Sequence, residues 1–379
     1  MNAAVNGYWK TLTAYSPVFT NWSGKLYESD IVRTAIHARA THISKLQVQI
    51  LGSAQPVMQT RLRQSPNSWQ TWNQFLYRLS TILDMQNTAF IAPVLDEYGR
   101  TVGIYPVLPS RCEVVEHGGE AWLRYQFSGG EKAAIEMDKC GVLTKYQYGD
   151  DFFGEKNTAL TPTMELINIQ NQGIQEAVKS SASYRFYARM TNFVKPDDLV
   201  KERKRFTEKN FREEGGGMLL FPNTYDNITQ IQSKPFVVDA DQMKMINTNV
   251  FNYFGVNEDI IQNKAVGDSW SAFYEGAVEP FAIQLSEVLT GMLFSRTERA
   301  NGAAVMATAN RLQYMSNKEK LEISAQMADR GIMNRDEIRE IWNLPPLPNG
   351  EGQAYTIRGE YYLLGDDGSK QKGGEGNGE

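Results

Sequence analysis

Cysteine and histidine are scarce in this chain. Its 379 residues include 2 cysteines and 3 histidines, too few for a disulfide framework or for most zinc sites. Cys112 and Cys140 lie 28 residues apart without a second cysteine near either, so we expect two buried free thiols, as in a reducing cytoplasm. His37 and His42 are five positions apart on one expected helix, which does not place them on one face. These shortages argue against a metal site and against Cys–His catalysis.

Long apolar runs and a basic surplus are also missing. No window approaches 18 uninterrupted apolar residues, and residues 1–20 contain no apolar core of a signal peptide. We therefore expect neither a membrane span nor a secretion signal. The net charge is -5, whereas proteins that grip nucleic acid through its phosphates usually carry a positive excess. The charge argues against tight, static DNA binding, but it does not exclude DNA that passes nearby.

The sequence contains no recognisable catalytic signature. Residues 215–217 are three glycines, but no Lys-Ser or Lys-Thr pair follows them and they come after an expected helix, as a helix stop does. No nucleophile elbow is present, and the carboxylates show no spacing beyond chance. We predict a protein that is not an enzyme, with no catalytic residues, no metal and no cofactor.

The first 160 residues alternate between helical and strand patterns. A helix is expected over residues 30–46, with Ser29 as its cap and an apolar stripe. That stripe comprises Ile31, Ala35, Ala38, His42 and Leu46. A strand over 47–51 and a helix from Ser68 follow. Hairpin strands are expected over 88–94, 102–107, 111–116 and 121–127.

The rest of the chain is mostly helical, so the predicted fold class is α+β with helices dominant. Helices are expected over 161–190, 196–213, 239–254, 271–294, 317–330 and 334–342. Short strands are expected over 218–221, 228–235 and 303–309. Pro280 lies inside one helical pattern and should kink that helix or begin a second segment. Residues 366–379 are rich in Gly, Lys and Glu and should be disordered.

The helix expected over 196–213 is densely charged. Its basic residues are Lys201, Arg203, Lys204, Arg205, Lys209 and Arg212. These side chains could contact DNA phosphates or the acidic face of a partner. Acidic residues nearly balance them, so a solvated helix with i,i+4 pairs explains the same pattern.

An ordered series of segments between residues 251 and 350 resembles the portal proteins of tailed bacteriophages. The series consists of Phe251-Asn-Tyr-Phe-Gly-Val-Asn-Glu-Asp-Ile-Ile261, the polar loop 263–270, Ala272-Phe-Tyr-Glu-Gly-Ala-Val-Glu-Pro-Phe281, Arg330-Gly-Ile-Met-Asn-Arg-Asp-Glu-Ile-Arg339 and Leu344-Pro-Pro-Leu347. The sequence departs from the family pattern at Asn334 and at Arg335-Asp336, but these residues can still start a helix. With weaker upstream matches, the resemblance spans residues 27–352.

The resemblance implies a multidomain portal-type subunit that forms a ring. It assigns residues 1–160 to an α+β wing, 161–193 and 239–256 to stem helices, 194–238 to the clip, 257–312 to the tunnel loop, tunnel helix and a wing strand, 313–350 to crown helices, and 351–379 to a C-terminal extension with a disordered tail. The tunnel-loop residues expected to face DNA are Asn263, Lys264, Ala265, Val266, Gly267, Asp268, Ser269 and Trp270. Lys264 could equally be an ordinary solvated loop residue.

The same resemblance implies a function. Portal proteins assemble as a dodecamer at one vertex of the capsid, where double-stranded DNA enters during packaging and leaves at infection. The implied partners are other copies of the chain, the terminase large subunit, the major capsid protein, the head–tail adaptor and DNA in transit, with no membrane. The six basic residues of the clip helix would bind the motor and then the adaptor. The implied location is the virion, with the host cytoplasm during assembly.

Two other functions fit the sequence less well. A nuclease would need clustered carboxylates at strand ends and a divalent metal, which the sequence does not suggest. A minor head protein or an adaptor would also bind a partner ring. The long helix pair with its insertion, followed by a loop and a kinked helix, favours the portal interpretation.

Overall fold

The computed structural model describes most of the chain between residues 26 and 356. The described residues are 10–11, 26–53, 58, 61–126, 130–181, 186–190, 197, 200–201, 204–205, 225–230, 239–308, 317–342, 344–356, 363–364 and 370–371. They divide into two compact units, one formed by 1–161 with 247–379 and the other by 162–246. Helices dominate and short antiparallel sheets accompany them, so the fold class is α+β, as predicted.

Two packed helices form one layer of the first unit. The first helix, α1 (Asp30–Ile43), packs against α2 (Trp72–Gln86). Its buried face comprises Val32, Ala35, Ile36, Arg39, Ala40 and Ile43. Ala35 was in the predicted stripe, but Ile31, Ala38 and His42 are only partly buried, so the buried face is shifted by about one position. The shift has a consequence, because it places a charged residue, Arg39, in the middle of an apolar face.

The second helix begins four residues later than the sequence suggested. Ser68 lies in a turn in which the amide of Trp69 donates to Oδ1 of Asn67 at 3.0 Å. The helix starts after Thr71, whose hydroxyl accepts from the amide of Gln74, while the Gln74 side chain accepts from the amide of Thr71. This reciprocal capping box satisfies two helix-terminal amide donors. The helix therefore begins after Thr71 and not at Ser68.

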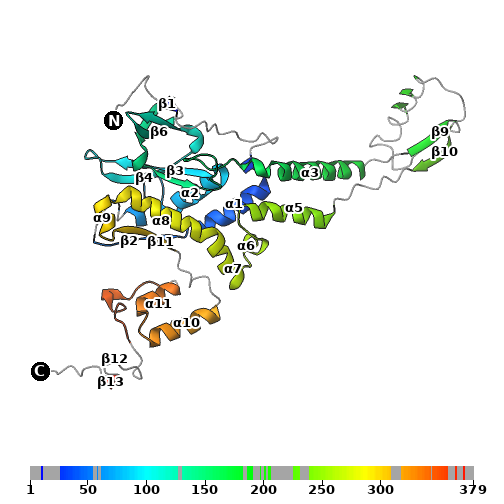
Figure 1. The fold of residues 1–379 in the computed structure, drawn as a ribbon. Helices are drawn as coiled ribbons and strands as arrows, with labels where there is room; N and C mark the ends of the chain where they lie inside the picture. The colour runs from blue at the N-terminus through cyan, green and yellow to red at the C-terminus, as the bar shows by residue number, and fades with distance from the viewer. Residues whose placement is uncertain are drawn as a thin grey trace. The chain divides into compact units, whose positions relative to one another are not determined.

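Two small antiparallel sheets belong to the same unit (Figure 1). In one sheet β3 (Thr88–Leu95) lies between β4 (Thr101–Val107) and β8 (Gly141–Thr144). The order in the other is β1 (Lys10–Thr11), β5 (Cys112–His117), β6 (Glu120–Gln126) and β7 (Lys132–Glu136). The hairpin strands were predicted, whereas β7 and β8 were not.

A shared apolar cluster joins the two sheets. Its buried members are Phe90, Val107, Cys112, Val114, Leu123, Cys140 and Phe153. Each large side chain buried in this way contributes about 1.5–3 kcal/mol. Both cysteines are free and buried, as the sequence predicted, and burial raises the pKa of the Cys140 thiol to about 12.

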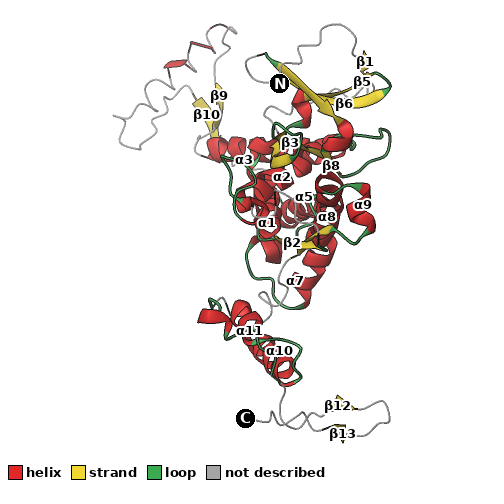
Figure 2. Ribbon diagram, turned by 90° about the vertical axis from the view of Figure 1, so that its left-hand side faces the viewer, coloured by secondary structure: helices red, strands yellow, loops and turns green. Residues whose placement is uncertain are grey.

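A further helix, α8 (Glu279–Leu293), lies alongside a two-stranded sheet in both views (Figure 1 and Figure 2). This sheet pairs β2 (Gln47–Leu51) with β11 (Ala304–Thr308). Hydroxyl groups of α8 accept from the free edge of β11, because the amide of Ala307 donates to Ser286 Oγ at 2.8 Å and that of Val305 to Thr290 Oγ1 at 2.9 Å. The strand edge is thereby covered.

The second unit, residues 162–246, contains the segment that the sequence assigned to the clip and most of the segments assigned to the stem. The helix α3 (Thr161–Ser181) leads into the paired strands β9 (Phe186–Met190) and β10 (Tyr225–Gln230), and α5 (Ala240–Tyr253) follows. The expected helix to residue 190 is wrong, because β-favouring Phe186 and Tyr187 pair with β10 instead. The strand expected over 228–235 lies over 225–230, and 218–221 falls outside the described residues.

Three further helices in the described part of the chain are α9 (Arg296–Ala300), α10 (Asn317–Asp329) and α11 (Arg335–Ile341). Asn334 caps α11 through a capping box with Glu337, as its position suggested. The pair β12 (Leu363–Leu364) and β13 (Lys370–Gln371) places a strand in the tail expected to be disordered, because its backbone groups find partners there. No described helix is both long and apolar enough to cross a bilayer.

Candidate functional site

The expected DNA-facing loop is held between two short helices of the first unit. It follows α6 (Glu258–Ile261), whose N-cap Asn257 accepts from the amide of Ile260 at 2.9 Å. It precedes α7 (Asp268–Phe273). The side chains of Ile260, Trp270 and Phe273 are buried. The loop therefore has an apolar anchor at each end.

The backbone of the loop is folded back onto α6. The amides of Lys264 and Ala265 both donate to the carbonyl of Asp259, at 2.8 and 3.2 Å. Asn263 adopts a left-handed conformation with φ 56°, which asparagine tolerates. Gly267 has φ 56° and ψ -125° at the start of α7, a conformation open essentially to glycine. The loop backbone is therefore defined even where its side chains are exposed.

The side chains of the loop are exposed and carry one cation. Lys264 is exposed, and its Nζ donates to Gln262 Oε1 at 2.7 Å. The Gln262 side chain in turn donates to Glu258 Oε1 at 2.8 Å. Val266 is 68% exposed. This stretch presents a tethered ammonium group and an apolar side chain to whatever faces it.

The eight loop residues predicted to face DNA do not all share this environment. Asn263 to Gly267 lie in the loop, whereas Asp268, Ser269 and Trp270 form the first turn of α7. The helix begins three residues before the expected position because Gly267 makes the chain reversal. Trp270 is 7% exposed and stacks on Tyr274 with ring centroids 5.3 Å apart. The indole, which was predicted to face DNA, is therefore part of the apolar anchor in this chain.

The helix after the loop is broken into segments, as Pro280 predicted. The first turns, α7, pass into a π-helical stretch, Tyr274–Val278, where the amide of Glu279 donates to the carbonyl of Tyr274, five residues back. The segment α8 then begins with Pro280 in its first turn. Proline lacks an amide hydrogen, so the wider π-turn accommodates the missing bond.

A buried ion cluster lies against this break. Arg39 of α1 is 5% exposed, and Asp84 of α2 is fully buried. Asp84 Oδ1 accepts from Arg39 Nη1 and, at 2.9 Å, from Lys145 Nζ. Burial lowers the pKa of Lys145, and the charge of Asp84 opposes that shift. The remaining donors of Arg39, Nε and Nη2, reach the carbonyl of Ala277 in the π-turn at 3.3 and 3.1 Å.

Sequence reasoning did not find this cluster, although a signal was present. An arginine at the centre of an apolar helical stripe must be paired, because a lone buried charge is strongly unfavourable. The stripe predicted for α1 did not include Arg39, so its burial was not anticipated.

A cleft opens beside the cluster and is rimmed by carboxylates. Its volume is about 650 Å³, and Arg39, Lys145 and Pro280 are among its lining residues. Glu275, Glu279 and Glu287 line it as well. Glu279 lies four positions after Glu275 and eight positions before Glu287, so the three carboxylates share one face of the broken helix. The exposed face of this helix is accordingly negative.

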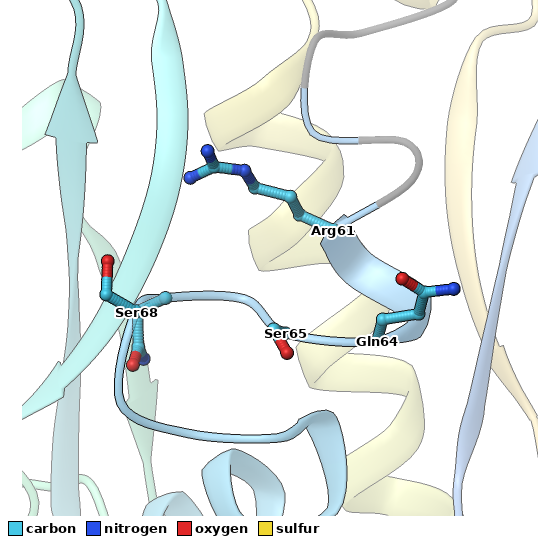
Figure 3. Close-up of a pocket in the computed structure, with 5 residues that line it drawn as sticks. Arg61, Gln64, Ser65 and Ser68 are labelled. Atoms are coloured by element: carbon cyan, nitrogen blue, oxygen red, sulfur yellow. The ribbon is translucent and has the colours of Figure 1, made fainter.

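A smaller polar pocket of about 270 Å³ lies in the connector between β2 and α2 (Figure 3). It is lined by Arg61, Gln64, Ser65, Asn67 and Ser68. The Arg61 side chain points across to a strand of the sheet, where Nη1 donates to the carbonyl of Val102 at 2.8 Å. This hydrogen bond links the connector to β4, so the guanidinium already has a partner within the protein.

Only part of the predicted basic clip surface is described. Lys201, Lys204 and Arg205 are helical and exposed. Arg203, Lys209 and Arg212 lie outside the described residues.

Across the residues that the structure does describe, no group of three or more His, Cys, Asp or Glu side chains could hold a metal ion. Burial, together with the charge of Lys45, lowers the pKa of His42 to about 4.

Comparison with known proteins identifies the fold. Residues 30–343 match the phage portal protein family, while no curated protein sequence matches the chain. A structure of the neck of an empty gene transfer agent particle, computed with C6 symmetry, is similar with a TM-score of 0.59 and 15% identity. That match covers 85% of this chain and 92% of the other. A native neck computed with C12 symmetry has a TM-score of 0.58 at 15% identity, with the same coverage.

A crystal structure extends the comparison. An HK97-family phage portal protein from Corynebacterium diphtheriae is similar with a TM-score of 0.50 and 12% identity, covering 78% of this chain and 96% of that one. The fold is that of a portal subunit, a structural component of a virus particle. Since the family match covers most of the sequence, the chain belongs to the phage portal protein family.

Proposed function

We propose that this chain forms the ring at one capsid vertex through which viral DNA is packaged and ejected. The observation that supports the proposal most strongly is the short loop, Gln262–Gly267, at the head of a kinked helix with a negative exposed face. The similarity of the whole chain to neck structures with C6 and C12 symmetry supports a cyclic assembly of twelve copies. The virion is then its location, with the host cytoplasm as the place of assembly.

The charges suit a channel that DNA slides through. Exposed carboxylates such as Glu275 and Glu287 repel phosphates, so the helix face does not hold DNA. Lys264 and the exposed Val266 lie in the preceding loop. A single ammonium in each copy gives weak contacts to phosphates that are easily exchanged. We infer that Asn263 to Gly267 touch DNA in transit, while the helix face keeps it centred.

The second unit supplies the proposed contact with other proteins. Lys201, Lys204 and Arg205 are exposed on one short helical stretch, and we assign the terminase large subunit, and later the head–tail adaptor, to this surface. The major capsid protein would surround the first unit. Substituting Lys201→Glu with Lys204→Glu should weaken motor binding at low salt, because close positive charges are reversed.

The matched control carries two reversals on a different helix. Arg296→Glu with Arg299→Glu changes two exposed charges of α9 and should leave motor binding unchanged. If both double variants bind the motor equally well, the clip surface does not contact the motor.

The assembly itself is tested by native mass spectrometry of the full chain with negative-stain images. We expect rings of about twelve subunits with a central hole, and a monomer at all concentrations with and without capsid protein would contradict the proposal.

A further inference from the structure

The broken helix after the loop is held differently on the two sides of its break. On the far side, α8 bonds to β11 through Ser286 and Thr290. It also packs on β8 so closely that a Cβ at Gly141 would lie 2.5 Å from Val288 Cγ1. On the near side, α7 rests on aromatic contacts, including Phe273 against the ring of His42 at 5.2 Å. The π-turn between them is the place where α7 and the loop could pivot.

The side chain of Arg39 hydrogen-bonds to that π-turn. Arg39 donates two hydrogen bonds, from Nε and Nη2, to one carbonyl, that of Ala277. The planar guanidinium offers these donors in a fixed fork, so the two bonds define the direction of the carbonyl as well as its distance. Since Ala277 lies inside the π-helical stretch, the fork acts at the break itself.

Arg39 is in turn held in one orientation. Its third donor, Nη1, binds Asp84, which is fully buried and also accepts from Lys145. Arg39 is only 5% exposed, so little water can reach its guanidinium to replace these partners. The cluster thus connects the rigid body of the unit to one peptide group of the broken helix.

We propose that Arg39, oriented by Asp84 and Lys145, is the positioning residue that fixes the π-turn and thereby the direction of α7 and of loop 262–267. Its significance for DNA rests on the proposed channel function, but its effect on the helix does not. The competing explanation is that the cluster only stabilises the packing of α1 and α2, as a buried ion pair anywhere in the core would.

The variant that separates the two explanations is Arg39→Lys, studied in the full chain. Lysine keeps the positive charge beside Asp84, but one ammonium on a flexible stem cannot provide the fork to Ala277. We expect amide hydrogen exchange in residues 262–281 to accelerate by about ten-fold, with β3, β4 and β8 unchanged. Unchanged exchange in 262–281, or acceleration spread evenly over the strands, would overturn the proposal.

A matched control and a second variant secure the result. Arg33 is an exposed arginine of the same helix whose Nε also donates to a backbone carbonyl, that of Tyr27 at 3.1 Å, so Arg33→Lys should leave exchange in 262–281 unchanged. Arg39→Met removes every donor and should accelerate exchange in that segment further. If Arg39→Met also lowers overall stability, exchange is compared at temperatures equally far below each Tm. Hydrogen exchange is measured without DNA, so the role of Arg39 in positioning the helix can be refuted or supported whether or not the chain forms a DNA channel.

Discussion

Replacing Asp84 by asparagine removes the only negative charge that the structure shows within the Arg39–Asp84–Lys145 cluster. The side chain keeps its volume, but two cations then share a buried site without a counter-charge. Removing one partner of a buried ion pair costs about 3–5 kcal/mol. We expect the lower end, about 3 kcal/mol, because Lys145 is partly accessible and can release its proton, whereas Arg39 cannot.

The assay is thermal unfolding followed by circular dichroism. A loss of about 3 kcal/mol lowers the Tm of a unit of this size by roughly 5 °C. The double variant Asp84→Asn with Lys145→Met removes one of the two unpaired cations and should regain a large part of the loss. The control Asp96→Asn breaks an exposed pair with Arg100 and should leave the Tm near that of the wild type. A wild-type Tm for Asp84→Asn would refute the view that this charge is needed in the core.

Four further outcomes follow from the structure. Gly141→Ala forces a methyl group against Val288 and Met292 and should cost about 1–3 kcal/mol by overpacking, measured by urea unfolding. Asn334→Ala removes the cap of α11 and should cost about 1 kcal/mol, by the same assay. The pKa of His42 is lowered from 6.5 to about 4, so the unfolded chain binds more protons between these values, and stability should fall as pH drops from 6.5 towards 4; with His42→Gln, thermal melts across this range should show a shallower decline. Lys264→Glu should leave ring assembly intact and reduce DNA packaging or retention in particles, and unchanged packaging and retention would rule out a role for this ammonium.

The sequence was most informative where a local rule decides the structure. Pro280 predicted the break between α7 and α8 because proline cannot supply an amide, and the separation of Cys112 from Cys140, with no other cysteine near, predicted free thiols. The start of α11 also followed from Asn334. The helix break and the start of α11 depend on a few neighbouring residues, so they can be found without knowledge of tertiary contacts.

Other features depend on partners that are distant in sequence. The end of α3 was predicted too late, since the strand Phe186–Met190 exists only with its partner β10. Trp270 was predicted to face DNA, but the ring stacks on Tyr274 once Gly267 turns the chain. Arg39 could be placed at the π-turn only with its partners Asp84 and Ala277, which are 45 and 238 positions away.

The most direct test of the channel asks whether the loop touches DNA inside the assembled particle. A photoreactive amino acid replaces Val266, which is 68% exposed in the loop, and a control variant carries it in place of Tyr98, which is 82% exposed at the β3–β4 turn. Particles stalled during packaging are irradiated, and covalent adducts between DNA and protein are counted. The proposed function predicts adducts at position 266 and none at position 98. Equal labelling at both positions, or none at 266 in particles that hold DNA, would contradict the assignment of this loop to the channel.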